Sequence, residues 1–231
     1  MRLDKYLAHA NFGSRKEVGE LIKSGRVTVR GKTVKDRKLK VKVEDEVRVD
    51  GFTVVLEEYM YFMLNKPQNV ISATESFEHE TVIDLIDHSQ YRELFPVGRL
   101  DIDTTGLLII TNDGKLSHQL LSPKKEVFKT YYCKLKHDVS KSDITFLETG
   151  IPLKDFTTKP AKVEVIEEDE VLLSISEGKF HQVKRMFKYL NNEVLELKRV
   201  KFGNLVLDET LEAGEYRRLT EDELTDLKKL I

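Results

Sequence analysis

The chain has 231 residues, 40% of them hydrophobic and 34% charged, and a formal net charge of -2, which allows a medium domain and a small one with proper cores. Its single cysteine, Cys133, excludes an internal disulfide framework and a multi-cysteine zinc site. We expect no metal. The absence of a signal-peptide core and of apolar runs near the roughly 20 residues that span a bilayer predicts a cytoplasmic protein.

The N-terminal part of the chain is strongly basic. Residues 1–40 contain 12 Lys and Arg but only 4 Asp and Glu, whereas the remainder contains 26 against 36. A basic segment of this kind suits a polyanion, because contacts to phosphates supply salt-sensitive affinity. The acidic remainder needs a local basic surface if it also binds nucleic acid.

The first fifty residues are expected to form two short helices and a small set of strands. The sequence Ser14-Arg15-Lys16-Glu17 is a capping box, after which apolar residues follow at helical spacing as far as Gly25. The alternation over residues 27–34 around a glycine predicts a hairpin, and residues 41–43 and 47–49 predict further strands.

These residues, together with Arg2-Leu3-Asp4 and Gly25-Arg26-Val27, resemble the S4 RNA-binding module. The resemblance implies an RNA-binding domain over residues 1–54, with Arg15, Lys16 and Arg26 as RNA contacts. Arg15 and Lys16 occupy the first turn of a helix, where backbone amides and the helix dipole also favour a phosphate. The alternative is a basic face that is merely solvated.

Residues 55–231 form a second, strand-rich domain in this interpretation. Strands are predicted over residues 59–64, 107–111, 129–135, 161–166, 171–176, 193–200 and 216–219, with helices between them. A capping box, Thr220-Glu221-Asp222-Glu223, opens a C-terminal helix. Another helix is predicted over residues 179–190, with an apolar stripe of Phe180, Val183, Phe187 and Leu190 opposite a basic cluster of His181, Lys184, Arg185 and Lys188.

The most informative motif is Gly98-Arg99-Leu100-Asp101-Ile102-Asp103-Thr104-Thr105-Gly106, which precedes the apolar run 107–110. An aspartate on an irregular approach to a buried strand is held rigidly and still faces a cleft, so Asp101 is a candidate for chemistry. The alternative is that the polar side chains of this motif only satisfy backbone donors in a turn.

Four motifs together resemble a pseudouridine synthase: Asn65-Lys66-Pro67, Gly98-Arg99-Leu100-Asp101, Lys129-Thr130-Tyr131, and residues 177–186. The S4-like module narrows the resemblance to the branch that modifies ribosomal RNA. Residues 181–187, His-Gln-Val-Lys-Arg-Met-Phe, resemble the type that acts on 16S RNA. The implied fold is α+β, with the S4 module followed by a mixed, mainly antiparallel sheet and flanking helices.

The resemblance also implies the reaction. The bond between uracil N1 and ribose C1′ breaks, the base turns, and C5 joins C1′, so no cofactor is needed. The sequence agrees, because it contains no phosphate-cradling glycine loop and no dinucleotide fingerprint. The partner is ribosomal RNA or a small-subunit assembly intermediate, whose target base must leave its stack. No membrane is involved, and a monomer is expected.

By the same resemblance Asp101 is the nucleophile, and it needs a basic partner because a partly dry pocket disfavours a carboxylate charge. The matching residue is Lys184, which replaces the commoner arginine and supplies a point charge in place of a bidentate fork. His181 and Arg185 are candidate RNA contacts. The alternative is that Lys184 and Arg185 both only line RNA phosphates.

Two further residues match family positions, and a third, Leu197, is a candidate for the pocket wall. Tyr131 matches the tyrosine that stacks on the target base and helps to remove the C5 proton, the alternative being a core tyrosine on a strand. Arg99 matches the arginine that enters the position vacated by the base, or else it pairs with Asp101 or Asp103. Leu197 forms a wall of the uracil pocket or belongs to the ordinary core.

Other functions are open at this point. A non-catalytic RNA-binding protein would use only the S4-like module. A glycosidase-like hydrolase would use Asp101 and Asp103, about 7 Å apart on one face of a strand, but the chain has no tryptophan for a sugar surface. The third alternative is the same isomerisation on a uridine of 23S RNA.

Overall fold

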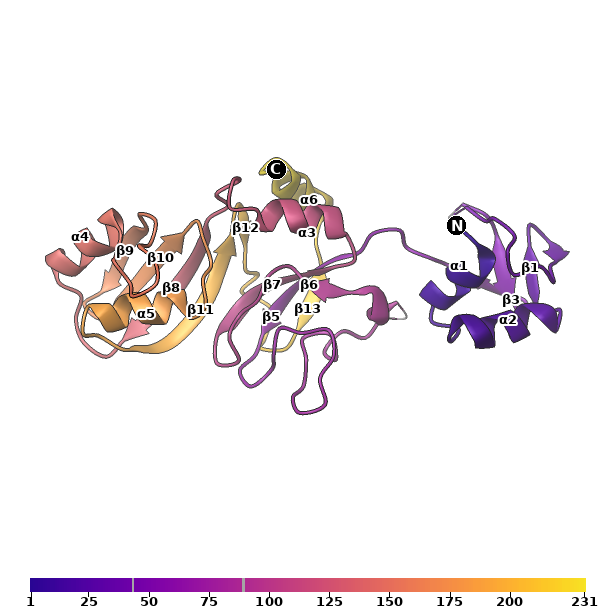
Figure 1. Cartoon of the computed structure of the whole chain (residues 1–231), viewed down its shortest axis with the longest axis horizontal. Helices are drawn as coiled ribbons and strands as arrows, with labels where there is room; N and C mark the ends of the chain where they lie inside the picture. The colour runs from indigo at the N-terminus through magenta and orange to yellow at the C-terminus, as the bar shows by residue number, and fades with distance from the viewer. Residues whose placement is uncertain (43, 89) are drawn as a thin grey trace. The chain divides into compact units, whose positions relative to one another are not determined.

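A computed structural model describes residues 1–42, 44–88 and 90–231 (Figure 1). Within them the chain divides into two compact units, one of Met1–Met60 with Ile86–Leu94 and the other of Tyr61–Leu85 with Phe95–Ile231. The first unit therefore includes a short segment from further along the chain. The domain boundary between residues 54 and 55 stays a prediction, which limited proteolysis would test.

The first unit contains two helices and a four-stranded sheet of order β2-β1-β3-β4. Its elements are α1 (Leu3–His9), α2 (Arg15–Lys23), β1 (Val27–Val29), β2 (Lys32–Thr33), β3 (Val47–Val49), β4 (Phe52–Val54) and the 3-10 turn η1 (Tyr91–Glu93). The predicted capping box of Ser14 and Glu17 is present. The predicted hairpin is also present, with Arg30 and Gly31 at positive φ, as a two-residue type I′ turn requires.

The strand predicted over residues 41–43 is wrong for its first two residues. Lys40 makes an isolated bridge to Arg2, and the N–H of Val41 donates to the carbonyl of Met1 at 2.8 Å. One bridge next to the start of the chain fixes this segment without extending it into the sheet. Val43, the third residue of that prediction, lies outside the described residues.

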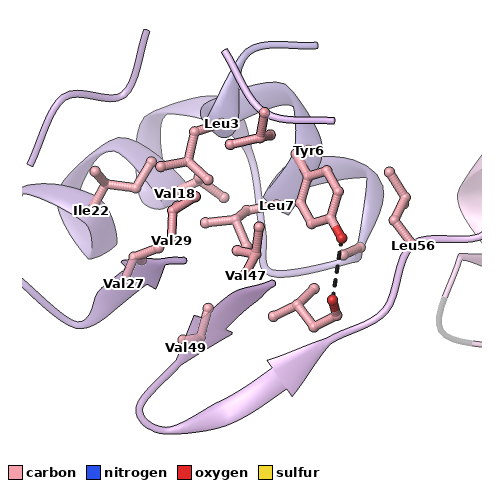
Figure 2. Packing of buried hydrophobic residues seen from close by; sticks show 13 residues of the cluster. Leu3, Tyr6, Leu7, Val18, Ile22, Val27, Val29, Val47, Val49 and Leu56 are labelled. Carbon is pink, nitrogen blue, oxygen red and sulfur yellow. Dashed lines mark hydrogen bonds between the residues drawn. The ribbon is translucent and has the colours of Figure 1, made fainter. Parts of the chain in front are cut away.

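The core of the first unit forms between its helices and its sheet (Figure 2). Apolar residues of the helices pack against alternate valines of the strands, namely Leu3, Leu7, Val18 and Ile22 against Val27, Val29, Val47 and Val49. Tyr6 is buried among them, and its hydroxyl donates to the carbonyl of Val54 at 3.2 Å. The alternation of strand residues thus puts every second side chain into one core.

The second unit is built on a nine-stranded sheet whose main path runs β13-β5-β7-β11-β8-β10-β9. Its strands are β5 (Tyr61–Lys66), β6 (Phe95–Pro96), β7 (Thr105–Thr111), β8 (Lys129–Leu135), β9 (Lys162–Glu167), β10 (Glu170–Ile175), β11 (Val194–Phe202), β12 (Leu205–Val206) and β13 (Tyr216–Arg218). Among its described strand pairings, β7 with β11 is parallel and the others are antiparallel. The predicted mixed, mainly antiparallel sheet is confirmed.

Helices cover both ends of this sheet: α3 (Gly114–Leu121), α4 (Lys141–Thr149), α5 (Gln182–Tyr189) and α6 (Glu221–Lys228) (Figure 1). Leu147 of α4 and Phe187 of α5 join the core beside β8 and β10, whereas Leu120 of α3 and Leu227 of α6 join the core beside β5 and β7. Cys133 is completely buried in the first of these cores, and burial raises the pKa of its thiol. In the described part of the chain, no helix is long and apolar enough to span a membrane.

Two elements begin later than predicted. Strand β5 begins at Tyr61 because its pairing with β7 begins there, opposite Thr111, where β7 ends. Helix α5 begins at Gln182 because His181 before it has a left-handed backbone, with φ of 50°. Phe180 therefore lies outside the helix and is 73% exposed, so its predicted place on the buried stripe is wrong.

Gly106 allows a close approach between β7 and β11. It pairs with Arg199 in the parallel register, and its φ is 97°, a conformation that favours glycine. A Cβ atom at this position would lie 2.3 Å from the carbonyl oxygen of Arg199. The turn that precedes β7 is thereby brought directly against β11.

Candidate active site

A cavity of about 690 Å³ opens beside the turn at residues 98–103, and its wall also includes residues of β8, β11, α5, the loop before α5, the segment 71–73 and the end of α3. A smaller cavity of about 90 Å³ shares Asp101 and Tyr131 with it and adds Thr104 and Leu197. All these residues belong to the second unit. Motifs that are far apart in the sequence thus meet around one space.

Asp101 lies in the turn before β7, and its backbone carbonyl accepts from the N–H of Thr104 at 3.0 Å. The side chain is 30% exposed. Lys184 Nζ lies 3.6 Å from one of its carboxylate oxygens, and His181 Nε2 lies 3.7 Å from the other. The structure therefore places two basic groups beside a carboxylate that borders both cavities.

Lys184 and Arg185 point to different carboxylates, although they are adjacent. Lys184 Nζ donates to Asp103 Oδ1 at 2.5 Å. Partial burial acts to raise the pKa of Asp103, but the hydrogen bond and charge of Lys184 lower it overall. Arg185 pairs with Asp155. Of these two residues, Lys184 is therefore the one beside Asp101, and Arg185 pairs with Asp155.

Asp101 and Asp103 do not lie along a strand, as the hydrolase alternative assumed. Both precede Thr105, where β7 begins, and both are close to Lys184. A turn does not hold residues i and i+2 on one face at strand spacing. The strand geometry that the hydrolase alternative assumed for this pair is therefore absent.

Lys66, at the end of β5, was given no role by the sequence. It is fully buried, and its ammonium group donates to the carbonyls of Pro67 and Thr104, both at 2.9 Å, and to that of Ile102 at 3.4 Å. Burial lowers its pKa to about 8, against the opposing effect of the nearby aspartates. Lys66 thus ties the backbone of the Asp101 turn to the sheet. The sequence signal for a role of Lys66 in the site was a lysine at the end of an apolar strand.

Tyr131 and Leu197 form a wall between the cavities and the core. Tyr131 lies on β8, is partly exposed and lines both cavities. Leu197 on β11 is 7% exposed, belongs to the core cluster of β8 and β10, and lines the smaller cavity. For Leu197 the two interpretations, core residue and pocket wall, therefore describe the same placement.

Two further basic side chains line the large cavity, and the sequence did not single them out. Lys129 on β8 is 9% exposed and Arg199 on β11 is 3% exposed. Lys129 Nζ and Arg199 Cζ lie 5.6 Å and 5.3 Å from the centre of the same ring, that of Phe202. Burial and, to a lesser degree, the charge of Arg199 lower the pKa of Lys129 to about 8. The signal for Lys129 was its place in the motif with Tyr131, whereas no local pattern marks Arg199.

The lowered pKa of Lys129 predicts a pH dependence of stability. Above about pH 10.5 the lysine is neutral in both folded and unfolded chains, and below about pH 8 the folded chain carries the buried charge. The wild type should therefore lose roughly 3 kcal/mol relative to Lys129→Met as the pH falls through this window. Urea denaturation at about pH 7 and about pH 10 measures the difference. A difference that is the same at both pH values would contradict the prediction, and Lys201→Met, at an exposed position of β11, is the control.

Arg99 is exposed and borders both cavities. The ion pairs described for Asp101 and Asp103 are with His181 and Lys184. The alternative in which Arg99 pairs with these aspartates to shape the turn is therefore not what the structure shows. Its guanidinium is left at the opening of the cavity.

Phe180 and His181 present an aromatic surface at the same opening. Their ring centres are 3.8 Å apart and their planes differ by 18°. The two residues line the large cavity from the loop before α5. Stacked rings of this kind offer a face on which an unstacked base can lie.

The basic candidates of the first unit differ in their surroundings. Arg15 and Lys16 are exposed in the first turn of α2. Arg26 is exposed but pairs with Asp50, with Nε 2.8 Å from Oδ1, and the hydrogen bond and charge of Asp50 raise the pKa of Arg26. Arg15 and Lys16 are thus better placed for a phosphate than Arg26.

Comparison with known proteins assigns the chain to a class. Residues 60–189 match the family described as RNA pseudouridylate synthase, and residues 1–47 match the S4 domain. The chain belongs to the RNA pseudouridylate synthase family, with an S4 domain at its N-terminus, which confirms the resemblance found in the sequence motifs. It is an RNA-modifying enzyme of that class.

Individual relatives match the whole chain. An uncharacterized RNA pseudouridine synthase of Bacillus subtilis (strain 168), YtzG, is 51% identical over 97% of both chains. The ribosomal small subunit pseudouridine synthase A of Vibrio cholerae is 44% identical over 99% of this chain and 100% of its own. A crystal structure described as pseudouridylate synthase covers 100% of both chains with a TM-score of 0.71 and 39% identity. The predicted likeness to the small-subunit type is thereby confirmed.

Proposed function

We propose that this enzyme converts one uridine of 16S ribosomal RNA to pseudouridine, with the flipped base held in the cavity and Asp101 as the nucleophile. The observation that carries the proposal is the meeting of Asp101, Lys184 and Tyr131 at one cavity in a chain of this family. The name of the Vibrio cholerae relative supports the small subunit as the source of the target.

In this proposal the residues in and near the smaller cavity have different roles in the reaction. Asp101 attacks from a turn whose backbone is fixed by Lys66, so that the carboxylate is already in position. Lys184 supports its negative charge. Tyr131 stacks on the uracil and helps to remove the C5 proton after C5 has joined C1′. Leu197 closes the apolar side of the pocket.

Residues at the opening of the large cavity contact the RNA strand around the target base. A base must leave its stack at a cost of a few kcal/mol before it can enter. Arg99 is exposed at this opening and stacks in the vacated position, while Phe180 and His181 offer their stacked face to a neighbouring base. Arg185 contacts RNA only if a phosphate replaces Asp155 as its partner.

The first unit anchors the enzyme on ribosomal RNA or on a small-subunit assembly intermediate. Arg15 and Lys16 bind phosphates from the first turn of α2, and Arg26 contributes from beside Asp50. The described residues that line the two cavities belong to the second unit, so anchoring and chemistry are separable. The cytoplasmic location and the monomeric state stay predictions.

Replacing Arg15 and Lys16 together by glutamine is expected to weaken binding to a 16S RNA fragment and to reduce the slope of log K against log salt by about two, because two phosphate contacts are lost. Turnover at saturating RNA should change little. Fluorescence anisotropy at several salt concentrations measures the affinity for RNA and its salt slope. Lys23→Gln in the last turn of α2 is the control. An unchanged slope would contradict the anchoring role.

Point substitutions are preferable to deletion of the first unit. The segment Ile86–Leu94 belongs to that unit, and within it Gln90 accepts from the N–H of Glu57 at 2.9 Å and Glu93 lies 3.2 Å from His9. A chain that lacks residues 1–50 would lose His9, the partner of Glu93 in this segment. A loss of RNA binding by the truncated chain would then have two causes.

The proposal is tested by mapping pseudouridines in both ribosomal RNAs of cells that lack this gene and are resupplied with wild type or Asp101→Ala. Carbodiimide adducts stop primer extension at each pseudouridine. One 16S stop that only the wild type restores is the expected result. A lost 23S stop would move the target to the large subunit, and an unchanged map would contradict ribosomal RNA as the substrate.

A further inference from the structure

The large cavity contains two buried cations that the proposed chemistry does not use. Arg199 Nε donates to the carbonyl of Leu107 at 2.7 Å, but its Nη2 atom has no hydrogen-bond partner. Lys129 is also buried, at 9% exposure. Among the described residues, neither side chain has a carboxylate within ion-pairing distance. Buried charges without a counterion are costly, so this pair is incomplete as it stands.

The carboxylates that border the same cavity have other partners. Asp101 and Asp103 lie against Lys184. Glu177 accepts from the side-chain amide of Gln182 at 2.9 Å and from a backbone N–H at 2.8 Å. None of these carboxylates forms a described ion pair with Lys129 or Arg199, so an anion from outside the chain can balance the two cations.

The sheet brings the two cations onto one face. In the antiparallel pairing of β8 with β11, Lys129 lies opposite Phe202 and Tyr131 lies opposite Arg199. Residues 199 and 202 of a regular strand would face opposite sides, but the register shifts between Arg199 and Lys201, and such a bulge restores them to the same side. All four side chains consequently line the cavity.

We propose that Lys129 and Arg199 form an anion subsite that binds a backbone phosphate next to the flipped uridine. The position of the base rests on the proposed function, in which uracil stacks on Tyr131. Lys129 is two residues from Tyr131 on the same strand face, about 7 Å along the strand, a separation that one ribose can bridge between a base and its phosphate. Phosphate oxygens also match the fork of donors on an arginine.

A phosphate at this subsite fixes the second end of the target nucleotide. The base is held between Tyr131 and Leu197, and the phosphate between Lys129 and Arg199, so the glycosidic bond between them is presented to Asp101. Lys129 and Arg199 thus act as binding and positioning residues. Because the subsite contacts only the phosphate, it does not distinguish uridine from other nucleotides.

The test compares the binding of uridine 5′-monophosphate, uridine and inorganic phosphate to the full chain by calorimetry. Wild type should bind the monophosphate at least about tenfold more tightly than uridine, as expected for a charge-assisted contact. Lys129→Met should bind the two equally. Lys201→Met removes a neighbouring charge on β11 that does not line the cavity, and it should keep the wild-type preference.

Equal binding of the two ligands by wild type, or a preference that persists in Lys129→Met, would overturn the subsite. Inorganic phosphate that binds as tightly as the monophosphate would show a site for the free anion and overturn its assignment to RNA. If Lys129→Met does not fold, Lys129→Gln makes the same comparison. A preference for the monophosphate that depends on Lys129, without any pseudouridine in the mapped RNAs, would support the subsite and refute the proposed function. A pseudouridine that depends on the wild-type enzyme, without such a preference, would refute the subsite alone.

Discussion

Asp101→Asn is expected to fold like the wild type and to form no detectable pseudouridine, a loss of roughly 10⁴-fold or more in turnover. The amide keeps the shape of the carboxylate but removes the negative charge that attacks the nucleotide in the proposed function. The surroundings are retained, because Lys184 keeps its 2.5 Å hydrogen bond to Asp103. Single-turnover assays with the RNA fragment measure the loss, and circular dichroism checks the fold.

Asp103→Asn is the matched control for this prediction. It makes the same chemical change two residues away, at a carboxyl that is 60% exposed and shares Lys184. Exposed ion pairs contribute about 1 kcal/mol or less, so the rate should fall by no more than about tenfold. A complete loss of activity in Asp103→Asn with an active Asp101→Asn would show that the nucleophile has been assigned to the wrong carboxylate.

Gly106→Ala is expected to destabilise the second unit by at least about 4 kcal/mol, a large part of the total stability of a domain. The added Cβ would lie 2.3 Å from the carbonyl oxygen and 2.9 Å from the nitrogen of Arg199. Both are backbone atoms of a paired strand, so they cannot turn away. Urea denaturation followed by circular dichroism measures the change, and poor recovery of folded protein at 37 °C is its simplest sign.

Gly214→Ala separates the two causes of this effect. Its φ of 93° is close to the 97° of Gly106, but an added Cβ would meet only Pro67, at 4.0 Å. The control therefore carries the cost of the left-handed backbone alone, about 1–2 kcal/mol. Equal losses in the two variants would mean that the close approach of β7 and β11 has no energetic weight.

Local sequence predicted those elements whose signals are themselves local. The capping boxes at Ser14 and Thr220 are present in the structure because each is a set of contacts within four residues. The ends of other elements depend on distant partners. Strand β5 begins later than predicted because its pairing with β7 begins at Tyr61, opposite Thr111, fifty residues away in the chain. No periodicity contains that information.

In the candidate site, too, some residues are predicted by local motifs and others depend on the fold. The motifs that carry Asp101, Tyr131 and Lys184 meet at one cavity, and each can be recognised by its neighbours in the chain. The burial of Lys66 and Arg199 was not predicted, although Lys66 belongs to the motif Asn65-Lys66-Pro67, because a single basic residue in a strand is normally solvated. Their burial results from the order of the strands, which puts β7 between β5 and β11 and covers both side chains.

The complete burial of Cys133 has a practical use. Its thiol is inaccessible and its pKa is raised, so reagents that need a thiolate have no target on the native chain. A cysteine introduced at Lys38 in the first unit and another at Lys154 in the second, both exposed positions, would be the only groups to take a dye. Energy transfer between the two dyes would then follow the separation of the units while RNA binds, without replacement of the natural cysteine.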